Sequence, residues 1–192
     1  MNQSDAKSQK YFAVSRAILE IIEKEGEENV THSRIARLSQ VSRPWIYEYM
    51  GREKEDLIDV AAEVFGSFFA RASTTAEPHN ACELKALLLD GQEIAFQNIK
   101  AEPVIIKLYY RFRGTTNPIG LVIKKYEKHW LDVMSENLMR ILNFDDQKAL
   151  NISRAILTLR LGFYHRVATS SEPDNEIALA KKALDLIHAQ IF

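Results

Sequence analysis

One short segment of the chain concentrates the side chains that could bind a polyanion. Residues 31–54 carry five Lys or Arg residues against two Glu residues, and aromatic residues lie between them. The cations are Arg34, Arg37, Arg43, Arg52 and Lys54, and the aromatic residues are Trp45, Tyr47 and Tyr49. Guanidinium and ammonium groups bind phosphate oxygens, and a guanidinium can also read the edge of a base. A basic cluster on a chain of net charge −1 therefore indicates a local anion-binding surface on an otherwise neutral protein.

Other kinds of chemistry have little support in the sequence. The patterns HExxH, GxSxG, GxGxxG and the P-loop do not occur, and the five His residues lack metal-ligand spacing. We therefore expect no enzymatic activity, no metal site and no cofactor. Cys82 has no second cysteine to pair with, the N-terminus lacks a hydrophobic signal core, and no apolar run is long enough to cross a membrane. These features predict a cytoplasmic protein with no membrane partner.

The basic segment is predicted to form two short helices joined by a turn. Thr31 is a good N-cap for a helix that ends near residue 38. Ser42 caps the next helix, and Pro44 lies in its first turn, where the missing N–H costs nothing. The contacts that hold the two helices together are assigned to Ile35, Ala36, Val41 and Ile46, and Tyr49 is expected in the same core. This spacing fits a helix-turn-helix, whose second helix has the size to enter the major groove of DNA.

The rest of the chain is also predicted to be helical, because apolar residues recur at intervals of three and four. Further helices are expected over about 7–25, 54–72, 82–100, 104–112 and 119–142, with Gly26 ending the first. Two apolar stripes, 152–167 and 177–191, predict a final pair of antiparallel amphipathic helices. The expected fold is all-α with about nine helices. Residues 1–52 are assigned to a three-helix DNA-binding domain and 53–192 to a larger ligand-binding and dimerisation domain.

The segment GEENVTHSRIARLSQVSRPWIYEYMGREKEDL resembles the helix-turn-helix of the TetR family of bacterial regulators. The matching features are a helix-ending Gly, a Thr, an Ile-Ala pair, a Val-Ser pair, a Tyr and a downstream Lys-x-x-Leu. The resemblance implies DNA contacts from Thr31, Ser42, Arg43, Pro44, Trp45, Tyr47 and Lys54. Among these, Thr31, Tyr47 and Lys54 would contact the phosphate backbone, and the others would open the recognition helix.

The segment departs from the family pattern at four places. Gln40 stands where Gly is usual in the turn, so a left-handed backbone is predicted at a non-Gly residue. Met50 replaces a Phe, and one extra residue precedes Lys54. Glu48 occupies a position that is often basic or aromatic. Trp45 has two interpretations, contact with DNA or packing against the first or fourth helix.

The resemblance further implies a homodimeric repressor that binds a palindromic operator and is released by a small-molecule effector. The dimer is expected to form through the last two helices, so that a charge at Leu184 or Ile187 would yield monomers. Aromatic residues in 53–192 favour an apolar or aromatic effector. The candidate pocket residues are Phe65, Phe69, Phe96, Tyr109, Tyr110, Arg113, Tyr126, His129, Trp130 and Phe163. The alternatives are a helical ligand-binding or protein-interaction module without promoter regulation, and an activator or nucleoid-associated protein.

Overall fold

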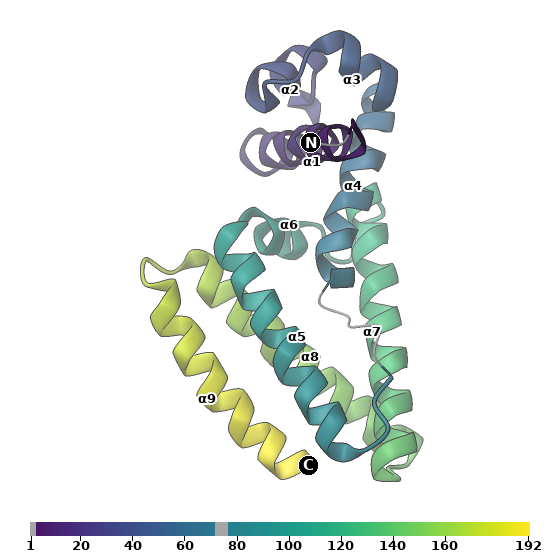
Figure 1. The fold of residues 1–192 in the computed structure, drawn as a ribbon, viewed down its shortest axis with the longest axis vertical. Coiled ribbons are helices and arrows are strands. Elements are labelled where there is room, and N and C mark those ends of the chain that lie inside the picture. Colours follow the sequence, from purple (N-terminus) through teal and green to yellow (C-terminus); the bar gives the residue numbers. More distant parts are fainter. Residues whose placement is uncertain (1–2, 72–76) are drawn as a thin grey trace. The chain divides into compact units, whose positions relative to one another are not determined.

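A computed structural model describes the backbone of residues 3–71 and 77–192, and the side chains of 6–67 and 77–192. Within these residues the chain forms nine α-helices, one 3-10 turn and no strand (Figure 1). The α-helices are α1 (Gln3–Glu25), α2 (His32–Ser39), α3 (Arg43–Tyr49), α4 (Lys54–Arg71), α5 (Ala81–Ala101), α6 (Val104–Phe112), α7 (Pro118–Leu142), α8 (Asp146–Thr169) and α9 (Pro173–Ile191). The prediction of an all-α chain is confirmed, and most helix ends fall within two residues of the predicted ones.

Local signals in the sequence explain where several helices begin and end. The Thr31 hydroxyl accepts a hydrogen bond from the Arg34 N–H, 3.4 Å away, and so caps α2 as predicted. Ser42 occupies the N-cap of α3, but its side chain makes no capping hydrogen bond, and Pro44 lies in the first turn. Gly26 follows α1 with a φ of 96°, a backbone conformation that glycine adopts without strain. These residues fix the ends of the helices around the basic segment.

The chain divides into two compact units. The first comprises Met1–Ser67 together with Leu108–Ile123, and the second comprises Phe68–Lys107 together with Lys124–Phe192. The core of the first unit is aliphatic and aromatic, and its fully buried side chains include Ile18, Ile22, Ile35, Ile46, Leu57 and Phe65. The helices α6 and α7 each contain residues of both units. The functional boundary assigned at residue 52 stays a prediction.

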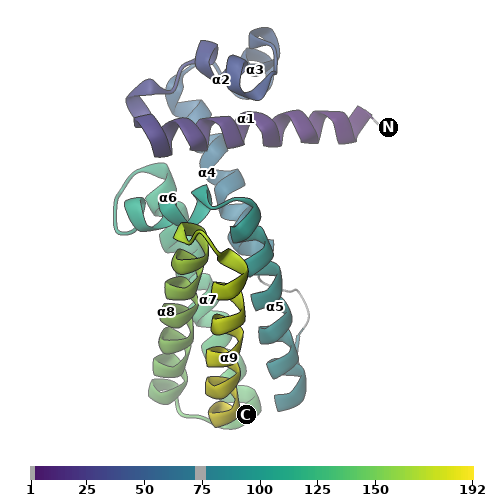
Figure 2. The same cartoon turned by 90° about the vertical axis from the view of Figure 1, so that its left-hand side faces the viewer.

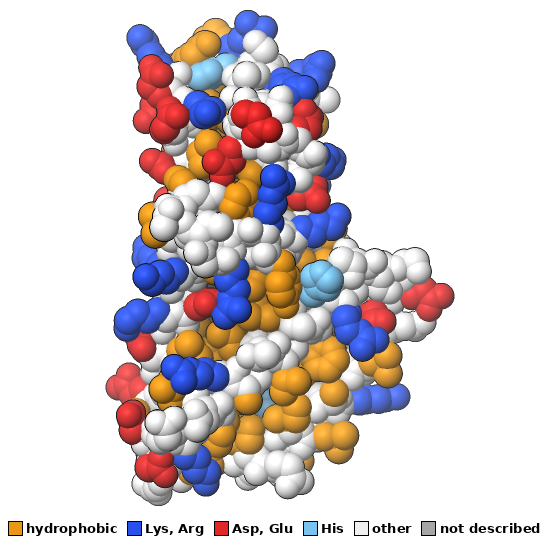
Figure 3. Space-filling view, turned by 180° about the vertical axis from the view of Figure 1, so that it is seen from behind, with side chains coloured by type: hydrophobic (Ala, Val, Ile, Leu, Met, Phe, Trp, Pro, Cys, Tyr) orange, Lys and Arg blue, Asp and Glu red, His pale blue; other side chains and the backbone are white. Residues whose placement is uncertain are grey.

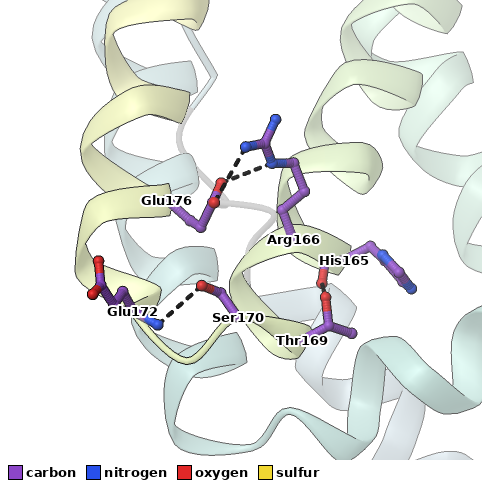
Figure 4. A network of polar contacts seen from close by, with 6 residues as sticks. All are labelled: His165, Arg166, Thr169, Ser170, Glu172 and Glu176. Carbon is purple, nitrogen blue, oxygen red and sulfur yellow. Dashed lines mark hydrogen bonds and ion pairs between the residues drawn. The ribbon is translucent and has the colours of Figure 1, made fainter.

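The second unit is built on α5, α7, α8 and α9. Its core includes a cluster of Leu84, Leu88, Met134, Leu138, Ala149 and Ile156, which come from α5, α7 and α8. The helices α8 and α9 run antiparallel, as predicted (Figures 1 and 2). Where they meet, the Arg166 guanidinium makes two hydrogen bonds to Glu176, of 2.7 and 3.2 Å (Figure 4). This ion pair raises the pKa of Arg166 and ties the end of α8 to the beginning of α9.

The predicted role of Leu184 in a dimer interface is wrong. Leu184 is fully buried within the second unit, and its neighbours Ile177 and Ala180 on the same stripe of α9 are also buried. An amphipathic helix turns its most regular apolar stripe toward the core of its own chain, which is why other helices of the second unit already cover this stripe. The exposed apolar residues of α9 are instead Leu179 and Leu186.

Candidate nucleic-acid interface

The turn between α2 and α3 has the geometry that the sequence predicts. Gln40 adopts a left-handed conformation, with φ 57° and ψ 24°, at the position where a Gly is usual. Ile35 and Ile46 are buried on the inner sides of the two helices, Val41 is buried in the turn between them, and Ala36 is partly buried. Met50 is also buried and so occupies the core position at the end of α3. These contacts hold α2 and α3 as a rigid pair.

The outer side of α3 carries the side chains predicted to bind DNA. Ser42, Arg43, Pro44 and Tyr47 are all exposed. The Tyr47 ring stacks on the His32 ring with 4.1 Å between centroids. The His32 Nε2 lies 3.1 Å from the Gly51 carbonyl oxygen, which accepts its hydrogen bond. Tyr47 is therefore held from α2 in a fixed position while its surface remains accessible.

Tyr49 does not belong to the core of the first unit, so that prediction is wrong. The side chain is 37% exposed, because Ile46 and Met50 fill the buried side of α3 in its place. The Lys7 ammonium lies 4.3 Å from the centroid of the Tyr49 ring. A hydrogen bond from Tyr49 to the Glu48 carboxylate raises the pKa of Tyr49. Glu48 thus has a partner on its own helix.

Trp45 is half-buried and lies toward α1. Its ring is tilted against the Tyr49 ring with 4.9 Å between centroids, and the Lys10 ammonium lies 5.9 Å from its centroid. This position agrees with the packing interpretation, and contact between Trp45 and DNA stays a prediction. Lys7 and Lys10 extend the basic and aromatic surface onto α1. Sequence reasoning missed both lysines, although their spacing of three places them on one side of a helix.

Lys54 is exposed at the first position of α4. The preceding Gly51 has a φ of 117°, so the extra residue before Lys54 is accommodated in a turn that favours glycine. The Glu53 N–H donates to the Asp56 carboxylate over 3.3 Å. Glu55 and Asp56 lie in the first turn of α4, so Lys54 has two carboxylates close to it in the sequence.

The predicted pocket residues are divided between the two units. Tyr109 and Phe65 are buried in the first unit, Tyr110 meets the Tyr109 ring edge-on, and Arg113 is exposed. The second unit contains buried Phe96, half-buried Tyr126, Trp130 and Phe163, and exposed His129. Phe69 lies outside the residues whose side chains the structure describes. The role of all these residues in ligand binding stays a prediction.

Two buried ionisable side chains of the second unit were not among these candidates. Arg160, on α8, and His188, on α9, both face the interior. Helical spacing could have identified them, because Arg160 follows Ile156 by four residues and His188 follows Leu184 by four. Among the described residues, no helix is long and apolar enough to span a membrane. The same residues contain no group of three or more His, Cys, Asp or Glu side chains placed to hold a metal ion.

Among known proteins, the chain matches solved structures but no family model or curated sequence. A putative TetR-family regulator from Syntrophomonas wolfei is 18% identical, with 97% of each chain covered and a TM-score of 0.64. The fatty acid degradation regulator FadR from Bacillus halodurans is 20% identical over 95% of this chain and 94% of its own, also at 0.64. SCO4454, a TetR-family regulator from Streptomyces coelicolor, is 16% identical over 96% of both chains, again at 0.64. The chain therefore has the fold of TetR-family transcriptional regulators.

Proposed function

We propose that this chain, which has the TetR-regulator fold, is a DNA-binding transcriptional regulator that acts as a homodimeric repressor. The observation that carries the proposal is the exposed side of α3. Arg43 and Tyr47 are accessible there, while Ile46 anchors the helix and the His32 ring holds Tyr47. A rigid short helix with accessible polar side chains at its beginning suits the major groove, where arginine reads guanine.

The phosphate backbone would be bound by residues around α3. Thr31 and Lys54 are exposed at the beginnings of α2 and α4. Lys7 and Lys10 on α1 add two further cations beside the rings of Tyr49 and Trp45. Phosphate contacts of this kind set the register of a protein on the duplex, and the base contacts of α3 would add sequence preference.

Dimerisation is part of the proposal because one short helix contacts too few bases to specify a site. Two copies with recognition helices about 34–36 Å apart would address successive major grooves of a palindrome. The exposed apolar residues Leu159 on α8 and Leu179 and Leu186 on α9 support an interface on these helices. The space beside Gly162 on α8 is open, which leaves room for a closely packed partner helix. Figure 3 shows hydrophobic side chains gathered on a face of the second unit.

An effector would act by binding more tightly to the state that does not bind DNA. The helices α6 and α7 supply a route between the units, because each contributes residues to both. Aromatic and aliphatic side chains make up the core cluster of the second unit, so the effector is proposed to have an apolar or aromatic body. Thermodynamic coupling of this kind would release the repressor without any covalent step.

A salt titration tests the proposal without knowledge of the operator. Fluorescence anisotropy would follow binding to a duplex of mixed sequence at increasing salt concentration. The affinity is expected to fall linearly on a log–log plot, with a slope of about 0.9 for each phosphate contact. An interaction that does not respond to salt, or no binding at low salt, would contradict the proposal and favour a protein-interaction module.

A further inference from the structure

Three polar side chains in the second unit are buried and carry atoms without hydrogen-bond partners. Gln92 on α5 is 2% exposed, Arg160 on α8 is 5% exposed and His188 on α9 is fully buried. The unpartnered atoms are the Gln92 Oε1, the Arg160 Nε and both ring nitrogens of His188. Buried polar groups in folded proteins are nearly always paired, so three such residues in one unit indicate that something else completes them.

The contacts of Arg160 define where these groups lie. Its guanidinium donates to the Leu88 carbonyl oxygen on α5 over 2.6 Å and lies 6.0 Å from the centroid of the Trp130 ring on α7. Gln92 is one turn beyond Leu88 on the same helix. Helix α9 packs against α8 and α5, and His188 is fully buried on its inner side. Burial lowers the pKa of His188, and the charge of Arg160 lowers it further. Helices α5, α7, α8 and α9 therefore surround one buried cationic group.

The charge of Arg160 is not balanced from within the described chain. Neither Arg160 nor His188 forms an ion pair in the described chain, and the one carboxylate that acts on His188 belongs to the exposed Asp185. Lys85 adds a second positive charge near the same imidazole. An isolated buried charge is strongly unfavourable, whereas a buried charge with a hydrogen-bonded counter-ion is tolerated.

Apart from these groups and the Tyr164 phenol, on which the charge of Arg160 also acts, the surroundings are apolar. Leu88 belongs to the core cluster of the second unit, and Trp130 and Phe192 pack against that cluster. The Phe192 ring also meets the His188 ring edge-on, with 6.1 Å between centroids. An anion with an apolar body would therefore match both the charge of Arg160 and its apolar neighbours.

We propose that Arg160, His188 and Gln92 form the binding site for the carboxylate of an amphipathic monocarboxylic acid. The guanidinium Nε–H and one N–H of the neutral imidazole donate to the carboxylate oxygens. The Gln92 Oε1 accepts from a hydroxyl or N–H adjacent to the carboxylate, and the apolar body packs among the aliphatic side chains and Trp130. The inference rests on the proposed function only in making this acid the effector, because binding itself requires no DNA.

Calorimetric titration of the full chain with matched acids and alcohols tests the site. The probes are decanoate and 4-phenylbutanoate, with decan-1-ol and 4-phenylbutan-1-ol as uncharged counterparts. At least one acid is expected to bind about tenfold or more tightly than its alcohol, the factor that charge-assisted hydrogen bonds supply. Equal binding of acid and alcohol, or no binding of either acid, would overturn the proposal.

Substitutions then test whether Arg160 causes the tighter binding of the acid relative to its alcohol. Arg160→Met is expected to abolish the difference between acid and alcohol and to melt no lower than the wild type, because it removes an unbalanced buried charge. Arg154→Met, at an exposed position on the same helix, is the matched control and should retain the difference. If Arg160→Met does not fold, Arg160→Lys keeps the charge without the planar fork and should reduce the preference at least about threefold. An unchanged preference in the variant that folds would overturn the proposal, while DNA binding, measured separately, would be unaffected.

Discussion

The Arg111 guanidinium on α6 donates hydrogen bonds to the backbone carbonyl oxygen of Ile22, over 2.8 Å, and to that of Glu23, over 3.0 Å. Both carbonyls belong to the last turn of α1, where the Ile22 carbonyl oxygen also accepts a hydrogen bond from the Gly26 N–H over 3.2 Å. A cation at this end also interacts favourably with the helix dipole. Arg111 therefore joins α6 to α1, the helix against which α2 packs.

Replacing Arg111 by Met should destabilise the protein by about 1 kcal/mol, because two charge-assisted hydrogen bonds are lost at a partly exposed site. Denaturant unfolding followed by circular dichroism would measure the change. Lys124→Met, at an exposed position on α7, provides the control and should change stability little. Equal stability of the Arg111→Met variant and the wild type would show that these hydrogen bonds contribute nothing.

Gln40→Gly should not lower the free energy of unfolding and should raise it by up to about 1 kcal/mol. Glycine removes the strain of a left-handed Gln, and this gain is offset in part by its greater freedom in the unfolded chain. Arg37→Gly, at an exposed position in the last turn of α2, should instead lower the free energy of unfolding by up to about 1 kcal/mol. Chemical denaturation of both variants checks the opposite signs. A similar loss in both would contradict the strain argument.

The features that the sequence predicted correctly depend on local rules. Thr31 caps α2, Gly26 ends α1, and Gln40 takes the conformation of the glycine it replaces, because each outcome follows from a few neighbouring residues. The incorrect predictions concern residues whose surroundings come from other helices. Tyr49 is exposed because Ile46 and Met50 occupy the buried side of α3, and Leu184 faces its own core because α9 packs against α8 and α5 of the same chain. The buried Arg160 was missed because composition suggested an apolar pocket.

Protonation of His188 should make the protein less stable as the pH falls. Burial and then Arg160 lower the pKa of His188 below its usual 6.5, so the folded chain holds the ring neutral. Below about pH 6.5 the unfolded chain takes up a proton that the folded chain refuses, and stability is lost as the pH falls toward the folded pKa. Melting temperatures at pH 7.5, 6.5 and 5.5 should therefore fall less steeply in His188→Leu than in the wild type.

The exposed Gln190, on the same helix, supplies the control for this experiment. Gln190→Leu removes no titratable group and should retain the wild-type dependence of melting temperature on pH. If the melting temperature of His188→Leu depends on pH as steeply as that of the wild type, the pKa of His188 does not differ between the folded and the unfolded chain, and the prediction is wrong.

Leu179→Glu combined with Leu186→Glu should convert the proposed dimer into a monomer. Both side chains are exposed on α9, and a carboxylate buried at an interface without a partner is strongly unfavourable. Light scattering after size-exclusion chromatography would give the mass of the variant and of Leu121→Glu, a control at an exposed position on α7. The control should remain dimeric. A double variant that is still a dimer would place the interface elsewhere.

Selection of bound fragments from random duplex DNA tests the central claim, that the surface around α3 reads DNA as a symmetric pair. The enriched sequences should contain two inverted half-sites whose centres are about one helical turn apart. Arg43→Ala should bind the enriched duplex more weakly by about 1–3 kcal/mol and with relaxed preference at one base position of each half-site. No enrichment over the starting pool would contradict the account.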